Sequence, residues 1–311
     1  MHQVNNTPIE IVGPAVLPLA LGWQAGEAQL IAVALQHPPV QIMLRPGAAL
    51  DLSGARADLA YSYAARWLAA HHLSGRVTVE VELAVPNFMG LSSAASLAAT
   101  LGRGLAHWYA QPPEDPRAIA AACGLPAPEL PLAQMAAEGG FWLYGLTEGH
   151  KPTLRRTIQH ANRHAWAFVL VLPRLDPVPA PTFETEQLAV ACQAATQLVP
   201  EATARATTEL VAALDADNLQ RFGAALSHLQ SLYIAMPTTP PLSAWEAQVL
   251  AQLRASGAVA CGRSLSGTAL FGLLEGDRAS ISARHALRQL VPPEQGRIMA
   301  AITDNAGVRW T

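Results

Sequence analysis

The chain has 311 residues, of which 51% are hydrophobic and 14% charged, and its formal net charge is −3. This length allows one large or two ordinary domains with real cores, and the composition excludes a disordered chain. The weakly acidic balance excludes a polybasic surface of the kind that binds nucleic acid or anionic lipid.

The three cysteines and the N-terminal residues indicate in which cellular compartment the protein is expected. Cys123, Cys192 and Cys261 are far apart and form no CxxC pair, which indicates buried thiols rather than a disulfide framework or a zinc site. The N-terminus lacks the basic and apolar regions of a signal peptide. The longest apolar stretch, residues 12–21, is too short to span a bilayer. We therefore expect a cytoplasmic protein.

The first half of the chain is predicted to mix short strands with helices. Apolar and alternating runs predict strands at 8–12, 29–35, 39–44, 77–85 and within 138–146. Helical periodicity predicts helices at 57–72, 93–109 and 112–122. Ser92 or Ser93 is the expected N-cap of the helix at 93–109. The Pro38-Pro39 pair is expected to separate two of the strands.

The second half begins near residue 165 with a strand at 166–173 that a proline closes. Two or three helices are predicted over 184–235, with a break at 215–217, and others at 243–255 and 278–291. Strands are predicted at 268–274 and 296–302. Strands and helices do not alternate strictly, which favours an α+β fold over a doubly wound sheet.

One stretch names a ligand class: residues 86–96, Pro-Asn-Phe-Met-Gly-Leu-Ser-Ser-Ala-Ala-Ser, lie between a predicted strand and a predicted helix. Backbone N–H groups at a helix N-terminus have no helical partners, and the helix dipole adds to their attraction for phosphate. The small residues Gly90, Ser92, Ser93 and Ala94 allow a phosphate to approach the backbone. An ordinary capped helix start is the alternative.

This stretch resembles the phosphate-loop signature of the GHMP kinase superfamily, in which Pro-x-x-x-Gly-Leu-(small)-Ser precedes further small residues. The resemblance implies a two-domain fold. An N-terminal βαβ domain with the phosphate loop would span residues 1–160, and a C-terminal ferredoxin-like α/β sandwich would span 161–311. It also implies that Gly90, Leu91, Ser92, Ser93 and Ala94 bind phosphate, and that the Ser93 hydroxyl is a ligand of Mg²⁺.

Further segments are similar to one branch of that superfamily, the β-ribofuranosylaminobenzene 5′-phosphate synthases, which make a pterin-cofactor precursor from phosphoribosyl pyrophosphate and an aminobenzoate. The Gly139-Gly140 turn, residues 214–223 and a C-terminal Gly/Ser loop carry this similarity. The residues of that C-terminal loop are Gly262, Arg263, Ser264, Ser266 and Gly267. Arg263 is the cation that could neutralise a phosphate or an acidic acceptor. A solvated loop arginine and turn-forming serines are the alternatives.

The chain also departs from the superfamily pattern. Ala94 stands where a second serine is usual, and residues 131–137 contain no carboxylate where many of these kinases place a catalytic Asp. Glu138 is adjacent to the Gly-Gly turn, but the sequence does not give its direction.

Three functions therefore remain open. They are a synthase-like transferase acting on phosphoribosyl pyrophosphate, an ATP-dependent small-molecule kinase, and a scaffold protein without turnover. In each enzymatic case we expect Mg²⁺ and a small phosphorylated substrate. A homodimer is left open, and neither a nucleic-acid nor a membrane partner is expected.

Overall fold

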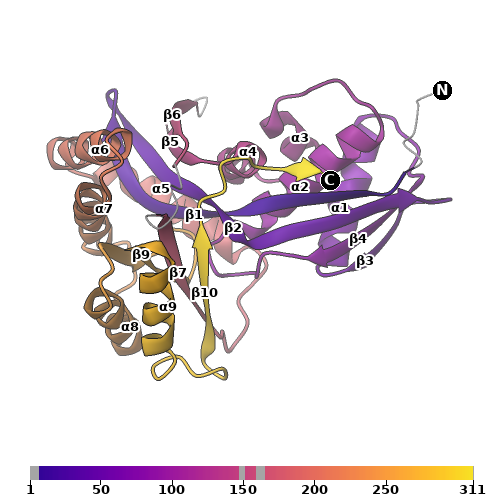
Figure 1. Ribbon diagram of the computed structural model, residues 1–311. Helices are drawn as coiled ribbons and strands as arrows, with labels where there is room; N and C mark the ends of the chain where they lie inside the picture. The colour runs from indigo at the N-terminus through magenta and orange to yellow at the C-terminus, as the bar shows by residue number, and fades with distance from the viewer. Residues whose placement is uncertain (1–6, 147–150, 159–164, 311) are drawn as a thin grey trace.

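A long β-hairpin runs through the molecule and contacts both halves (Figure 1). The computed structural model describes residues 7–146, 151–158 and 165–310. Strands β1 (Ile9–Gln24) and β2 (Glu27–Pro46) pair antiparallel, from Ile9 opposite Leu44 to Gln24 opposite Glu27. Most of β1 is buried on both faces because helices of both halves pack on it. Burial on both faces explains why residues 12–21 are apolar without alternation.

The predicted strands in this region are therefore too short. The strand predicted at 8–12 continues to Gln24, and those predicted at 29–35 and 39–44 are one strand. Prolines 38 and 39 fall where the β1–β2 register shifts. On its other edge, β2 pairs with β5 over residues 29–33 and with β4 over 41–46. The prolines lie between these pairings, where the missing N–H groups interrupt no ladder.

The N-terminal half is built on a seven-stranded mixed sheet. Its strand order is β11-β1-β2-β4-β3, and β5 and β6 extend from the other part of β2. Strand β3 (Asp51–Gly54) runs parallel to β4 (Val77–Leu83), and α1 (Ala57–Ala70) connects them. This connection forms a βαβ unit, in which the helix and β4 were predicted and the strand β3 was not. The other elements of this half are α2 (Ser93–Trp108), α3 (Pro116–Ala122), a 3-10 turn (Ala127–Glu129), α4 (Leu130–Glu138), β5 (Phe141–Gly145) and β6 (Pro152–Arg156).

The helix predicted over 112–122 begins only at Pro116. Asp115 is its N-cap, and its carboxylate accepts a hydrogen bond from the Arg117 backbone N–H at 2.9 Å. Pro116 takes the first helical position, where a missing N–H costs nothing. The cap thus sets the helix start, and residues 112–114 remain outside the helix.

The C-terminal half is a four-stranded antiparallel sheet covered by helices. Its strands are β7 (Trp166–Pro173), β8 (Ala260–Arg263), β9 (Leu270–Glu275) and β10 (Gly296–Ile302). Their order, β10-β7-β9-β8, is the ferredoxin-like arrangement. The helices are α5 (Phe183–Ala194), α6 (Pro200–Asp215), α7 (Leu219–Ile234), α8 (Ala244–Ala255) and α9 (Gly276–Leu287). The predicted α+β fold with two such halves is confirmed.

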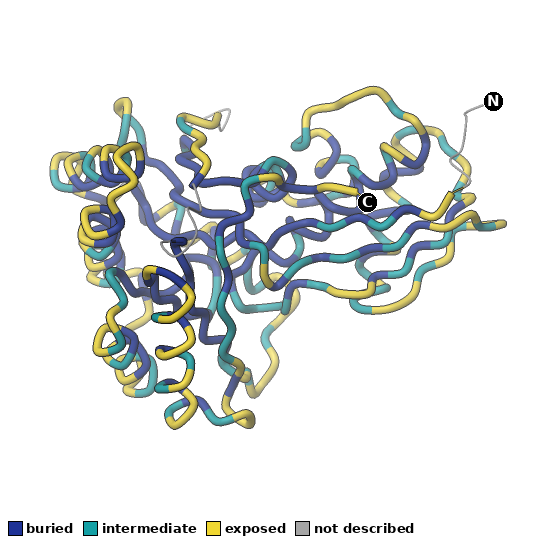
Figure 2. Tube along the Cα trace, in the orientation of Figure 1, coloured by how far each residue is buried: buried dark blue, intermediate teal, exposed yellow. Residues whose placement is uncertain are grey.

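The two halves share one hydrophobic core, which appears as the dark tube through the middle of Figure 2. Phe222 on α7 packs between Phe141 on β5 and Trp166 on β7, with ring centroids 5.7 and 4.8 Å apart. After β10 the chain returns to the N-terminal sheet, where β11 (Arg309–Trp310) pairs with β1. The boundary predicted at 160/161 lies outside the described residues. Within the described ranges, no helix is long and apolar enough to cross a membrane.

Candidate phosphate-binding site

The Gly90–Ser93 loop, residues 90 to 93, connects the segment after β4 to the N-terminus of α2. Gly90 has φ 74° and Ser92 has φ 56°, so the loop reverses direction through two left-handed residues. Glycine adopts this conformation without strain, whereas other residues do so at a cost. The first turn of α2 contains no acidic residue of its own that could balance the helix dipole.

The two serines of the loop have different partners. The Ser92 hydroxyl donates to the Val16 carbonyl at 2.9 Å, and the Val16 N–H donates to the Leu91 carbonyl at 3.2 Å. Ser92 therefore anchors the loop to β1. Ser92 is the N-cap residue of α2, as predicted, but neither Ser92 nor Ser93 makes a side-chain capping hydrogen bond. The tie to β1 takes the Ser92 hydroxyl, and the Ser93 hydroxyl contacts another helix.

The C-terminal Gly/Ser loop, Gly262 to Gly267, packs directly on the Gly90–Ser93 loop. The Ser264 hydroxyl donates to the Gly90 carbonyl at 2.6 Å, and the Ala269 N–H donates to the Met89 carbonyl at 2.8 Å. A Cβ on Gly267 would lie 2.5 Å from the Met89 carbonyl carbon, so only glycine permits this approach. The structure thus brings two of the predicted loops together.

The remaining members of the C-terminal loop have separate roles. A Cβ on Gly262 would collide with the buried Gln230 side chain. Ser266 is buried, its N–H donates to the Ser264 hydroxyl at 3.3 Å, and its own hydroxyl has no hydrogen-bond partner among the described residues. The Arg263 guanidinium donates to the Pro240 carbonyl at 2.7 Å and lies 3.5 Å from the Glu246 carboxylate. Arg263 is therefore engaged within the C-terminal half, and its contacts do not support a role as a phosphate ligand.

The Gly139-Gly140 turn lies at a second place, between α4 and β5. Gly139 has φ 70° and Gly140 has φ 92°. The Gly139 carbonyl accepts from the Trp142 indole at 2.8 Å and from Arg155 Nε at 3.2 Å, while the Gly140 N–H donates to the Asp304 carbonyl at 2.6 Å. These contacts hold the turn between β6 and the segment that returns from β10, which indicates a structural role.

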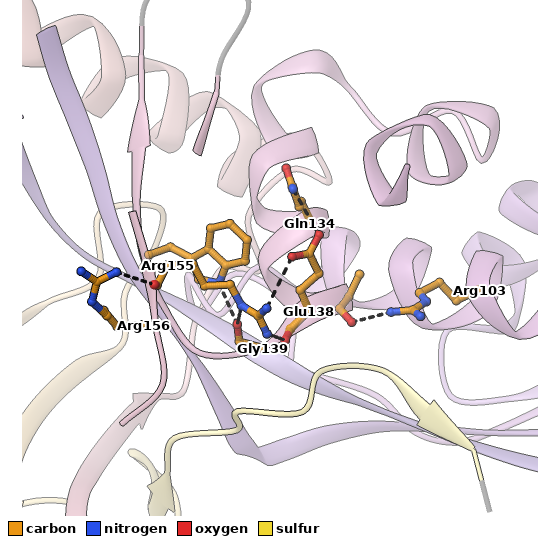
Figure 3. Close-up of polar contacts among 8 residues, drawn as sticks. Arg103, Gln134, Glu138, Gly139, Arg155 and Arg156 are labelled. Atoms are coloured by element: carbon orange, nitrogen blue, oxygen red, sulfur yellow. Dashed lines mark hydrogen bonds and ion pairs between the residues drawn. The ribbon is translucent and has the colours of Figure 1, made fainter. Parts of the chain in front are cut away.

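Figure 3 shows that Glu138 points toward Arg155 at this turn. Its carboxylate accepts from Gln134 at 3.2 Å and lies 3.9 Å from Arg155 Nη1. Nearby, Arg103 donates to the Ala137 carbonyl at 2.7 Å, and Arg156 donates to the Arg155 carbonyl at 3.1 Å. The acid next to the turn is thus part of a local polar cluster rather than of the Gly90–Ser93 loop.

A carboxylate that the sequence did not single out occupies the loop. Glu184, in the first turn of α5, accepts the Gly90 N–H on Oε1 at 2.7 Å and the Ser93 hydroxyl on Oε2 at 2.6 Å. Burial raises the pKa of Glu184, and the hydrogen bonds from Ser93 and Gly90 oppose that increase. Acidic residues are common in the first turn of a helix, so its sequence position gave no signal of this contact.

A cavity of about 350 Å³ adjoins the loop, and Ser93, Ala94 and Glu184 are part of its wall. Arg56, Arg66 and Asn87 line it as well. Arg56 Nη1 and Asn87 Oδ1 are buried atoms without a hydrogen-bond partner among the described residues. Buried polar atoms are normally paired, so these two are available to a ligand. Arg56 and Arg66 were not predicted, because they lie in a segment distant in sequence from the loop. Asn87 lies within the stretch 86–96, but the sequence assigned it no role.

Glu129, on the 3-10 turn, is a second acid in this cavity. It is 5% exposed and accepts a hydrogen bond from the Thr185 hydroxyl on α5. Burial raises its pKa, against the effects of that hydrogen bond and of Arg56. Across the described residues, no three His, Cys, Asp or Glu side chains are grouped so as to hold a metal ion.

This chain is similar to known proteins in its fold but not in its sequence. The sequence matches no family model and no curated protein. The fold is similar to that of homoserine kinase from Cytophaga hutchinsonii, with a TM-score of 0.70 and 14% identity over 100% of this chain and 99% of the other. It is also similar to L. major mevalonate kinase in complex with R-mevalonate, with a TM-score of 0.73 and 16% identity over 98% and 100% of the two chains.

A third structure was solved with ligands. It is MDDEF in complex with MVAPP, AMPPCP and magnesium, with a TM-score of 0.64 and 14% identity over 98% of each chain. Identities this low establish a shared fold alone. The chain thus has the fold of the GHMP kinase superfamily, while the resemblance to its synthase branch stays a prediction.

Substituting Gly90 tests the contact between the two loops. An alanine at position 90 would be strained in the left-handed backbone conformation, at a cost of roughly 1–2 kcal/mol. Its Cβ would also clash with the Gly267 nitrogen at 2.5 Å. Gly257→Ala is the matched control, because Gly257 has φ 92° but nothing within 4 Å of the new Cβ. We expect urea unfolding to show that Gly90→Ala lowers the free energy of unfolding by about 1–3 kcal/mol more than Gly257→Ala does. Equal losses would contradict the close packing.

Because burial raises the pKa of Glu129, we expect the stability of the protein to depend on pH. A carboxyl whose pKa is raised by folding contributes stability below its unfolded pKa and loses that contribution as the pH rises through the folded value. Glu129→Gln should therefore raise the thermal midpoint relative to wild type near pH 8, by an amount that shrinks as the pH falls toward 4.5. The exposed Glu186→Gln controls for the loss of one charge. A difference that grows on acidification would contradict the raised pKa.

Proposed function

We propose that the chain is an ATP-dependent small-molecule kinase that binds the nucleotide phosphates at the Gly90–Ser93 loop. One observation carries this proposal. The Gly90 N–H and the Ser93 hydroxyl already converge on an anion, the Glu184 carboxylate, at 2.7 and 2.6 Å. Donors that hold one set of anionic oxygens at a helix N-terminus are suited to phosphate oxygens.

The cavity beside the loop supports a ligand with several polar groups. The unpaired Arg56 Nη1 is a donor for a phosphate, and the unpaired Asn87 Oδ1 is an acceptor for an amine or hydroxyl. Ser93 is the residue that would bind Mg²⁺ through its hydroxyl. Because the described residues hold no preformed metal cluster, we propose that Mg²⁺ enters with the nucleotide and neutralises its phosphate charge.

The chemistry proposed for this site depends on positioning rather than on a strong base. Residues 131–137 contain no acid, and Glu138 is held by Gln134 and Arg155. Phosphoryl transfer proceeds mainly through alignment and charge stabilisation. The Gly90 N–H, the Ser93 hydroxyl and the α2 N-terminus would supply that stabilisation. The acceptor is proposed only as a small molecule.

A synthase-like transferase would use the same loop for the pyrophosphate of phosphoribosyl pyrophosphate. The loop donors suit either ligand. The kinases and the AMPPCP complex among the similar folds favour ATP, of which AMPPCP is an analogue. Titration with phosphoribosyl pyrophosphate and Mg²⁺ separates the two functions, since binding of that ligand in preference to Mg·ATP would favour the synthase.

A binding or assembly protein without turnover is a third candidate. The observation that favours it is the combination of an occupied loop with the lack of an acid over residues 131–137. A substrate screen with Mg·ATP distinguishes this candidate, because any phosphoryl transfer that Ser93→Ala abolishes excludes it.

Removing the Ser93 hydroxyl tests the proposed nucleotide site. We expect millimolar Mg·ATP to raise the thermal midpoint of the wild type, and Ser93→Ala to weaken binding about tenfold, the effect of losing one charge-assisted hydrogen bond. Ser62→Ala is the control, because Ser62 lines the same cavity away from the loop sequence. Equal binding by all three proteins would contradict a role for the loop. No binding of Mg·ATP by the wild type or by a Glu184 variant would contradict the proposed function.

A further inference from the structure

We infer that Glu184 is an internal anion of the Gly90–Ser93 loop, which a phosphorylated ligand must displace before it can bind. This inference rests on the proposed function in one respect, because it concerns the same loop. It goes beyond that function by giving α5 an autoinhibitory role.

The competition follows from the number of donors. A backbone N–H and a hydroxyl each have one proton to donate. In this structure the Gly90 proton and the Ser93 proton are both directed to Glu184, one to each carboxylate oxygen. The Ser92 hydroxyl is used by Val16, and the Ser264 hydroxyl by the Gly90 carbonyl. A phosphate can therefore gain the Gly90 and Ser93 donors only when the Glu184 carboxylate leaves.

Charge also favours the internal contact. The first turn of α2 has no acidic residue, so the positive end of that helix lacks a counter-charge within its own sequence. Glu184 supplies that charge from α5. Glu129 is a second acidic side chain in the wall of the same cavity. Until Glu184 moves away, its carboxylate therefore repels an incoming phosphate as well as occupying the loop donors.

The contacts of α5 allow this displacement. Apart from Glu184, its first turn is held to the N-terminal half by the Thr185–Glu129 hydrogen bond and by the Phe183 ring against Phe88, with centroids 6.4 Å apart. A proline-rich segment, residues 177–181, precedes the helix. The adjoining cavity is also lined by Arg66, whose guanidinium could donate hydrogen bonds to the carboxylate after it leaves the loop. A change of the Glu184 side chain can therefore empty the loop without unfolding α5.

The test measures anion binding separately from nucleotide chemistry. Isothermal titration with inorganic tripolyphosphate would be carried out on the wild type, Glu184→Ala, Glu184→Gln and Glu186→Ala. Glu186 is on the same turn of α5 but is exposed and has no described side-chain contact, so it is the matched control. We expect Glu184→Ala to bind at least about tenfold more tightly than wild type, equivalent to about 1.4 kcal/mol. Glu186→Ala should stay within about twofold of the wild type.

Two further variants keep the result interpretable. Glu184→Gln has the same shape without the charge and should bind tripolyphosphate more tightly than wild type, which covers the case in which the alanine variant is unstable. Adding Ser93→Ala to Glu184→Ala should cancel the gain, because the gained binding is at the loop. Unchanged affinity in both Glu184 variants, an equal gain in Glu186→Ala, or no binding by any variant would overturn the inference.

The same proteins distinguish this inference from the proposed function. A gain in tripolyphosphate affinity without binding or turnover of Mg·ATP in any variant would support the internal anion and contradict the kinase. Equal Mg·ATP binding and turnover by the wild type and Glu184→Ala, with no gain for tripolyphosphate, would support the kinase and overturn the internal anion.

Discussion

Two loops from opposite halves of the chain meet backbone to backbone at Gly90 and Gly267, and the candidate site depends on this contact. The Ser264 hydroxyl donates a hydrogen bond to the Gly90 carbonyl, and the Ala269 N–H donates one to the Met89 carbonyl. This contact uses the carbonyl groups of Met89 and Gly90 but not the Gly90 N–H, which is therefore available to an anion. The packing therefore determines which backbone groups face a ligand, and side chains larger than hydrogen at Gly90 or Gly267 are incompatible with it.

The anion found at these donors belongs to the protein itself. A carboxylate and a phosphate both present oxygens to a helix N-terminus, so the contact of Glu184 indicates what the loop can bind and also what opposes that binding. Ser92 anchors the loop to β1 through its hydroxyl, whereas Ser93 is the residue that reaches the ligand position. The two adjacent serines thus divide into a structural and a binding residue.

Much of the fold could be predicted from local patterns. Most helices and strands and the Gly90–Ser93 turn follow from periodicity and glycine positions, and the βαβ and ferredoxin-like halves follow from the family resemblance. The short strands β3 and β8 were not predicted. The length of the hairpin could not, because residues 12–21 are buried by helices distant in sequence and therefore lack alternation. Glu184 and Arg263 show the same limit at the site. Glu184 resembles an ordinary helix-start acid, and Arg263 resembles a loop cation until Pro240 and Glu246 are placed beside it.

A crystal structure of the protein with Mg·ATP tests the central claim most directly. We expect phosphate oxygens within hydrogen-bond distance of the Gly90 N–H and the Ser93 hydroxyl, and a Glu184 carboxylate that has moved off the loop. A nucleotide bound elsewhere, with Glu184 still accepting both hydrogen bonds, would contradict it.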